Sequence, residues 1–203
     1  MDKLERSFYV RDTLVVAQEL LGKVLVHETP NYKIAAKIVE TEAYIGPEDK
    51  GSHSYGGRRT KRTEVMYQIG GTAYVYIIYG MYHCFNVVTE EEGKPSAVLI
   101  RAVEPIEGEM HMSELRYGKD ISALSSKQKL NICNGPGKLC LAMGIGKAEN
   151  SLDLCGGKLY ISDMYNEPFN IKSSPRINID YAGEYAEKPW RFYIGGNKYV
   201  SKG

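Results

Sequence analysis

Two acidic residues and a tyrosine form the first group in the sequence that could carry out a reaction. Glu40, Glu42 and Tyr44 alternate with Val39, Thr41 and Ala43. Along a strand, alternate side chains point to one face at a spacing of about 7 Å. A carboxylate held on such a face can act as a general base toward water. The alternative interpretation is a strand edge on which both carboxylates are solvated.

Two further polar residues interrupt apolar runs. Asn86 lies within Cys-Phe-Asn-Val-Val, and Arg101 lies within Val-Leu-Ile-Arg-Ala-Val. A buried polar side chain is unfavourable unless it has a partner. The two residues therefore either bind backbone or carboxylate groups in the core, or line a cavity. If Arg101 faces Glu42, both interpretations hold, because a charged neighbour often orients a catalytic carboxylate.

Three exposed segments offer weaker signals. His53 and the basic run at residues 58–62 are typical of a solvated loop, but the positive charge also suits a phosphate backbone. Tyr79 occupies an expected hairpin tip, where a ring either packs on the protein or inserts between bases. Lys138 follows Asn-Gly-Pro-Gly at an expected helix start, which is a generic anion site.

The candidate residues belong to segments with clear strand or helix patterns. Residues 72–79 carry the strongest strand signal, and residues 82–89 and 96–103 continue it as a three-stranded meander. Further strands are expected at residues 23–28, 33–44, 158–162, 176–180 and 190–194, and helices at residues 14–21 (capped by Asp12), 107–117, 125–132 and 138–143. Because strands and helices do not alternate strictly, we predict one compact α+β domain over residues 1–203. It has a curved, mainly antiparallel β-sheet, flanking helices and a protruding β-hairpin.

The composition excludes several classes of protein. With 203 residues, of which 43% are hydrophobic and 25% charged, the chain is not disordered, collagen-like or a solenoid. It contains no stretch near the roughly 18 apolar residues of a membrane span, and no secretory signal pattern. The net charge of +1 makes any phosphate affinity a local property. The four cysteines have no zinc-like spacing, so we expect reduced thiols and no metal. The 16 tyrosines indicate a wet binding surface lined with rings.

Several of these segments together resemble one protein family. They are Val39 to Tyr44 (VETEAY), His53-Ser54, Gly57-Arg58, Tyr74 to Tyr82 (YVYIIYGMY), Cys84 with Asn86, Leu99 to Pro105 (LIRAVEP), Gly135 to Cys140 (GPGKLC) and Lys188 to Tyr193 (KPWRFY). In this order they are similar to the alkyladenine (3-methyladenine, N-methylpurine) DNA glycosylases, from about Leu14 to the C-terminus. The chain resembles a bacterial homologue. It departs from the family pattern in the segment RRTKRT at residues 58–63 and at His83.

The resemblance implies a reaction in DNA base-excision repair. Glu42 matches the general base that activates water, and Arg101 matches the residue that helps to hold that water. Glu40 falls outside the reaction centre by the same match. The N-glycosidic bond breaks through an oxocarbenium-like state, which implies a monofunctional hydrolase that needs no lysine nucleophile and no cofactor.

The resemblance also implies how the damaged base is held. The base is flipped out of the duplex into a pocket, where it stacks between Tyr44 on one side and His53 with Tyr76 on the other. Asn86 excludes guanine by crowding its 2-amino group. The expected substrates are 3-methyladenine and 7-methylguanine, with hypoxanthine and ethenoadenine as further possibilities.

The implied partner is double-stranded DNA that contains damaged purines. A hairpin enters the minor groove with Tyr79 at its tip, and this ring fills the gap left by the flipped nucleotide. We expect further DNA contacts from Arg58, Met81, Tyr82 and Lys138. The protein is expected to be a monomer that acts in the cytoplasm at the nucleoid, without a membrane.

Two alternatives remain at this point. One is a helix-hairpin-helix glycosylase, because residues 134–138 with Gly144 and Gly146 faintly resemble its hairpin and Asp153 matches its carboxylate. That class is largely helical. The other is a non-catalytic module that binds nucleic acid through a tyrosine-rich sheet.

Overall fold

The computed structural model describes residues 2–163 and 168–201. The strands are β1 (Asp2–Lys3), β2 (Val24–Glu28), β3 (Lys33–Ile45), β4 (Ala73–Ile78), β5 (Tyr82–Thr89), β6 (Ser96–Glu107), β7 (Leu159–Asp163), β8 (Ile171–Ser174) and β9 (Arg191–Ile194). The helices are α1 (Arg6–Tyr9), α2 (Thr13–Glu19), α3 (Glu109–Tyr117), α4 (Ser126–Leu130) and α5 (Pro136–Met143). Short 3₁₀ turns are η1 (Tyr55–Gly57), η2 (Glu64–Tyr67), η3 (Ile121–Ala123), η4 (Lys147–Glu149) and η5 (Asp180–Tyr185).

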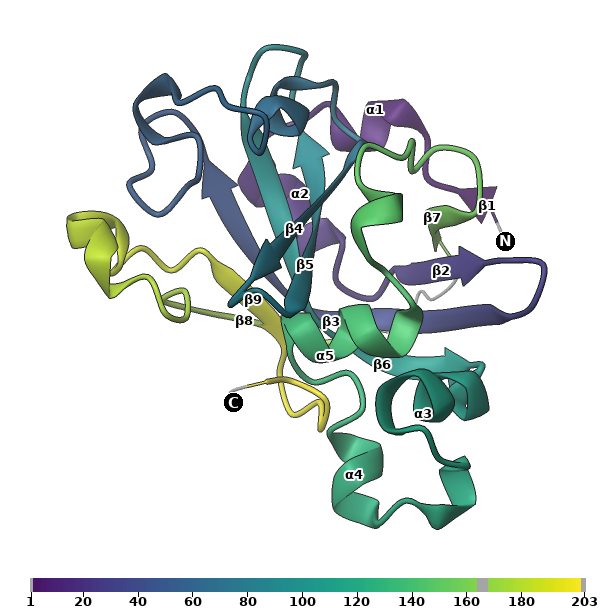
Figure 1. The fold of residues 1–203 in the computed structure, drawn as a ribbon. Helices are drawn as coiled ribbons and strands as arrows, with labels where there is room; N and C mark the ends of the chain where they lie inside the picture. Colours follow the sequence, from purple (N-terminus) through teal and green to yellow (C-terminus); the bar gives the residue numbers. More distant parts are fainter. Residues whose placement is uncertain (1, 164–167, 202–203) are drawn as a thin grey trace.

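These strands form one open antiparallel sheet with β3 at its centre (Figure 1). The order is β1-β7-β2-β3-β6-β5-β4. One edge of β3 pairs with β6, whereas the other edge pairs first with β2 and then with β9, which carries β8. The predicted single α+β domain with a mainly antiparallel sheet is confirmed. Segments from both ends of the chain therefore meet on one central strand.

The pairing of β3 with β6 is irregular where the two glutamates lie. The register shifts between Ile38 and Glu40 and again between Glu40 and Thr41. Irregularities of this kind bend a strand and change the direction of its side chains. Glu40 and Glu42 are both fully buried, so the interpretation as a solvated strand edge is wrong. Two buried carboxylates require charged or hydrogen-bonding partners.

The β4–β5 hairpin has a strained tip. Met81 N donates to Ile78 O over 3.3 Å, and the two residues between them, Tyr79 and Gly80, have φ angles of 53° and 70°. Positive φ at both central positions is typical of the turn that matches the twist of a hairpin, but it is uncommon for a bulky residue. The Tyr79 side chain is 79% exposed. Figure 1 shows the tip beside α5.

Helices α2 and α5 pack against the sheet through their buried residues. As predicted, α2 begins after Asp12, whose carboxylate accepts a hydrogen bond from Val15 N over 3.0 Å. Helix α5 begins at Pro136, two residues earlier than expected, because proline is favoured at the first helical position. Its buried residues pack against β5 and β6 in the main hydrophobic core. The start of α5 is thereby fixed beside the hairpin tip.

The strand expected at residues 176–180 is a wrong prediction. The strand in this region is β8, and the chain then continues as a loop in which Asn178 has a φ of 61° before η5 begins. Ile177 and Ile179 alternate as they would in a strand. However, Ile177 N donates to a side chain of β3, Glu42 Oε1, over 2.8 Å. Within the described residues, no helix is long and apolar enough to cross a membrane, and the four cysteines are free thiols.

Candidate active site

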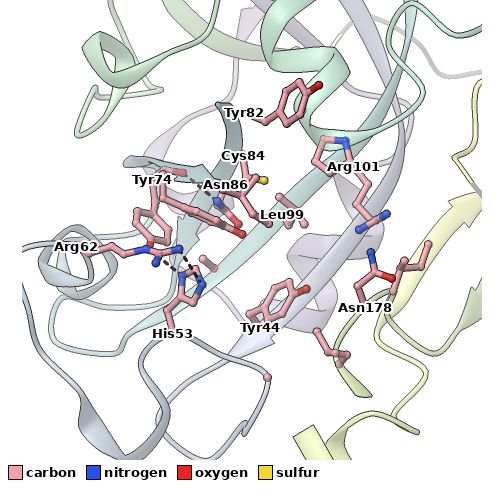
Figure 2. Close-up of a pocket in the computed structure, with 18 of the residues that line it drawn as sticks. Tyr44, His53, Arg62, Tyr74, Tyr82, Cys84, Asn86, Leu99, Arg101 and Asn178 are labelled. Atoms are coloured by element: carbon pink, nitrogen blue, oxygen red, sulfur yellow. Dashed lines mark hydrogen bonds between the residues drawn. The ribbon is translucent and has the colours of Figure 1, made fainter. Parts of the chain in front are cut away.

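A cavity of about 410 Å³ lies between the sheet, the hairpin and the loop after β8 (Figure 2). Such a volume is within the usual range for small-molecule sites. It is lined by Tyr44, Gly51, His53, Arg62, Met66, Tyr74, Tyr76, Ile78, Tyr79, Tyr82, Cys84, Asn86, Ala97, Leu99, Arg101, Pro136, Gly137, Ile177, Asn178, Ile179 and Tyr181. The structure thus brings together Tyr44, His53, Tyr76, Asn86 and Arg101, all of which the sequence analysis assigned to one pocket.

Glu42 lies directly behind the cavity wall and is held by three donors. Its Oε2 accepts hydrogen bonds from Tyr44 Oη (2.8 Å) and Arg101 Nη1 (3.3 Å), and its Oε1 accepts one from Ile177 N (2.8 Å). Tyr44, Arg101 and Ile177 all line the cavity. Donors of this kind, one of them cationic, stabilise the negative charge of a carboxylate. A carboxylate has about four acceptor positions, so Oε1 retains capacity for one further donor.

Arg101 joins Glu42 to the second buried glutamate. Its Nε donates to Glu40 Oε1 over 3.1 Å. Burial alone would lower the pKa of Arg101, but the two carboxylates more than offset this and raise it. Glu40 also accepts from Arg191 Nε (2.7 Å), from Ser201 N (2.7 Å) and from Ser201 Oγ (2.9 Å). The C-terminal segment therefore completes the charge network that fixes the Arg101 guanidinium.

Tyr44 forms one wall of the cavity and is supported by a buried arginine. The Arg176 guanidinium lies 4.6 Å from the centre of the Tyr44 ring and 5.1 Å from that of Trp190. Arg176 is itself paired with Asp49 and donates to Ala43 O over 2.9 Å. Burial raises the pKa of Tyr44 well above its usual value, and the nearby charge of Glu42 adds to this. The phenol therefore stays protonated and donates to the carboxylate.

His53 with Tyr74 and Tyr76 forms the opposite wall, and Figure 2 shows His53 across from Tyr44. The His53 ring centroid lies 4.6 Å from that of Tyr76, and its Nδ1 is 2.9 Å from Tyr74 Oη. The loop that carries His53 is anchored by Ser54 Oγ, which donates to Pro95 O over 2.8 Å. Burial lowers the pKa of His53 to about 4, with the charges of Arg62 and Arg58 as lesser causes. The imidazole is therefore neutral near pH 7.

Asn86 and Leu99 contribute to the cavity from paired positions on β5 and β6. Asn86 is buried, and its Nδ2 donates to Tyr74 O over 3.0 Å. This bond ties Asn86 to the neighbouring strand β4 and fixes the plane of its amide. Both of the open interpretations of this polar residue are correct, because it binds a backbone group and also lines the cavity.

Comparison with known proteins identifies the family. The sequence profile described as methylpurine-DNA glycosylase (MPG) matches residues 7–198. The chain belongs to this family. It is 56% identical over 201 residues to a protein of Desulfitobacterium hafniense, with 99% of each chain covered. It is 57% identical over 199 residues to one of Clostridium acetobutylicum, with 98% of this chain and 97% of the other covered. Both relatives carry the provisional name 3-methyladenine DNA glycosylase.

Membership in the methylpurine-DNA glycosylase family makes the protein a DNA glycosylase of the 3-methyladenine type and confirms the resemblance found in the sequence. The sheet-rich fold also contradicts the helix-hairpin-helix alternative, which requires a largely helical chain. Among the described residues, no group of histidine, cysteine and acidic side chains is arranged to hold a metal ion.

Two of the five residues expected to contact DNA line this glycosylase cavity. Tyr79 and Tyr82 line it, and Met81 is exposed beside them at the tip of the hairpin. Arg58 is exposed but does not line the cavity. Lys138 lies in α5, where its Nζ donates to Asn134 Oδ1 over 2.8 Å. Burial, with a smaller contribution from Arg116, lowers the pKa of Lys138.

Several cavity residues were not predicted as site residues from the sequence, among them four polar or loop residues. Arg62 was counted only within a basic loop, and Ile177, Asn178 and Tyr181 fell in or beside the wrongly expected strand. Asn178 lies near Tyr44 and Arg101 in Figure 2, in a left-handed conformation that is uncommon outside glycine. The alternating apolar residues after Pro175 do not indicate that Asn178 lies at the cavity.

Proposed function

We propose that the protein is a monofunctional glycosylase that flips damaged purines out of duplex DNA and hydrolyses the N-glycosidic bond with a water activated by Glu42. The observation that carries this proposal is the buried Glu42 carboxylate, held by Tyr44, Arg101 and Ile177 behind the wall of a cavity large enough for a purine. The family supports the reaction type.

The attacking water binds Glu42 Oε1, beside Ile177. Because Ile177 lines the cavity, water at this oxygen adjoins a base held there. The oxygen of water forms a bond to C1′ of the sugar, one of its protons passes to Glu42, and the C1′–N bond breaks with both electrons leaving on the purine. The carboxylate also stabilises the oxocarbenium-like sugar. The products are a free base and an abasic site.

The flipped base stacks between Tyr44 and the wall formed by His53 and Tyr76. A cationic alkylated purine is attracted by aromatic faces. The fixed amide of Asn86 crowds the 2-amino group and so slows the release of unmodified guanine. The base 7-methylguanine carries the same group but is still released, because its positive charge lets it depart as a neutral molecule. This pocket accepts 3-methyladenine and 7-methylguanine, and it accepts hypoxanthine and ethenoadenine through the further contact argued below.

DNA is bound at the rim of the cavity. Tyr79 inserts into the gap that the flipped nucleotide leaves, which its 79% exposure at the hairpin tip supports. Met81 and Tyr82 contact the minor groove beside it. Arg58 and Lys138 contact phosphates, an interaction that weakens with added salt.

No lysine lines the cavity among the described residues, which supports hydrolysis over a covalent Schiff-base route. The abasic strand therefore remains uncut by the protein itself. Borohydride should trap no adduct between the purified protein and a damaged duplex. A trapped adduct would contradict the monofunctional mechanism.

The decisive experiment is incubation with duplexes that each carry one defined lesion, followed by alkaline cleavage at abasic sites. The wild-type protein should release 3-methyladenine or 7-methylguanine. Glu42→Gln should lose base release by about 10³-fold or more, because an amide cannot accept the proton of water, while still binding the damaged duplex in a gel-shift assay. Glu48→Gln, an exposed residue of the loop that follows β3, is the matched control. Equal release by Glu42→Gln and wild type would refute the proposed role, and binding without release by wild type would favour the non-catalytic alternative.

A further inference from the structure

Three arginines line or support the cavity, and they differ in their partners. Arg101 is paired with Glu40 and Glu42, and Arg176 is paired with Asp49. Arg62 lines the cavity as well, yet no carboxylate among the described residues forms an ion pair with it. The positive charge of Arg62 is therefore not neutralised by a carboxylate among the described residues. The side chain is exposed, so water screens this charge until a base and DNA cover it.

The contacts of Arg62 direct this charge at the aromatic wall. Its guanidinium lies 4.7 Å from the centre of the Tyr76 ring, and its Nη2 is 3.3 Å from His53 Nε2 (Figure 2). A guanidinium can only donate, so Nε2 accepts and the proton of His53 resides on Nδ1, toward Tyr74 Oη. His53 is thus a neutral ring with its acceptor nitrogen turned to Arg62. It has no proton at Nε2 to give to a base.

The two classes of damaged purine pose different chemical problems. An N3- or N7-alkylated purine is cationic and departs as a neutral molecule. A neutral purine such as hypoxanthine keeps both bonding electrons on N9 and departs as an anion, unless an acid protonates it. Neither His53 nor Tyr74, the two groups of this wall nearest to Arg62, is a ready acid near pH 7, because burial lowers the pKa of His53 to about 4 and raises that of Tyr74 to about 12. A fixed positive charge is the other means of stabilising that anion.

We propose that Arg62 is a specificity-determining residue that stabilises the departing base when the substrate is a neutral purine. The proposal rests on the base-releasing function proposed above. The C1′–N9 bond breaks with both electrons on the purine, and the negative charge that develops there is offset by the Arg62 guanidinium. Water gives its oxygen to C1′ and one proton to Glu42. The purine anion takes a proton after it has left the sugar.

The same charge acts against cationic substrates. A guanidinium already on the face of Tyr76 reduces the attraction of that ring for a second cation, and the two positive charges repel each other. The repulsion between the Arg62 guanidinium and a cationic base becomes stronger once the bound base has excluded water from the cavity. Arg62 therefore shifts the preference of the enzyme from cationic toward neutral lesions.

The test is single-turnover release of hypoxanthine and of 7-methylguanine from otherwise identical duplexes at saturating protein. In Arg62→Leu the rate for hypoxanthine should fall about 10²-fold, whereas the rate for 7-methylguanine should rise, so that the ratio of the two rates falls by more than 10²-fold. Arg62→Lys should recover a large part of the ratio because it keeps the charge. Arg59→Leu, which removes a neighbouring arginine paired with Glu64, should leave the ratio at the wild-type value.

Three results would overturn the proposal. If Arg62→Leu slows both substrates equally, the residue supports folding or DNA binding and does not determine specificity. If the wild type releases 7-methylguanine but not hypoxanthine, Arg62 does not serve neutral bases and the inference fails while the proposed function stands. If the wild type releases neither of these bases nor 3-methyladenine, the proposed function fails and the inference fails with it.

Discussion

The hydroxyl of Tyr44 donates a hydrogen bond to Glu42 Oε2 over 2.8 Å, so that the aromatic wall of the cavity and the carboxylate behind it form one unit. In the mechanism proposed above, the ring that stacks on the base would thereby also orient the carboxylate that activates water.

Tyr44→Phe tests this unit because it keeps the ring and removes the donor. We expect base release to slow about 10- to 100-fold, since a hydrogen bond to a charged group contributes about 1.5–3 kcal/mol. Binding of the damaged duplex should change little. Single-turnover rates and gel-shift titrations measure the two effects. Tyr55→Phe, outside the cavity lining, is the control, and a wild-type rate in Tyr44→Phe would show that the hydroxyl has no part in the reaction.

Glu40→Gln should destabilise the fold by about 3–5 kcal/mol. Glu40 is fully buried and pairs with Arg101 and Arg191, and removal of one partner from such a network leaves buried charge uncompensated. Chemical denaturation at pH 7.5 gives the change in the free energy of unfolding. Base release measured well below the melting temperature should also fall, because Arg101 loses one of the two negative charges that orient it. A loss of less than about 0.5 kcal/mol would contradict the network.

The protonation of His53 makes stability depend on pH. The pKa is 6.5 in the unfolded chain and about 4 in the folded protein. Below pH 6.5 the unfolded chain therefore binds more protons, and stability falls as the pH decreases from about 6.5 to about 4. The full effect is at most about 3 kcal/mol, and less because the ring is partly exposed.

The measurement is the free energy of unfolding of wild type and His53→Gln at pH 7.5 and pH 5.0. The variant should lose less stability than the wild type over this interval, because its side chain does not titrate. The other histidines contribute equally to both proteins and cancel in the difference. Identical pH dependence would mean that His53 titrates normally in the folded protein.

Tyr79→Gly should stabilise the protein while it impairs function. Tyr79 has a φ of 53° and an exposed ring that contributes little to packing. Glycine adopts this conformation without strain, which is worth up to about 1 kcal/mol. Loss of the ring that we propose to insert into DNA should reduce base release from duplex DNA by about tenfold or more. Thermal unfolding and release assays would reveal the trade-off, and a less stable variant would show that the ring packs on the protein.

The sequence predicted the elements with strong local patterns, and it predicted which faces they share. Alternation over residues 72–79 and 82–89 predicted the hairpin, and the contact of Arg101 with Glu42, which the sequence raised only as a possibility, is present in the structure. These predictions succeeded because the period of a strand is fixed by its backbone. Arg101 also pairs with Glu40. This second contact lies where the register of β3 with β6 is irregular, and local sequence patterns do not reveal such an irregularity.

Contacts that depend on distant segments were not predictable. Arg176 lies 133 positions after Ala43, to whose carbonyl it donates, and its place behind Tyr44 follows from the tertiary fold alone. Ile177 and Ile179 alternate as they would in a strand, but the backbone N–H of Ile177 donates to the buried Glu42 carboxylate and not to a neighbouring strand. Buried charge overrode the local strand preference in this loop.

The donors around the two buried glutamates have a consequence for how the protein is made. Glu40 and Glu42 are synthesised well before Ile177, Arg191 and Ser201, whose donors bind them. When the β4–β5 hairpin has been synthesised, the nascent chain therefore still lacks several of the donors that stabilise these two carboxylates. A premature stop codon just before codon 191 therefore removes two partners of Glu40, although strands β1 to β8 have already been translated.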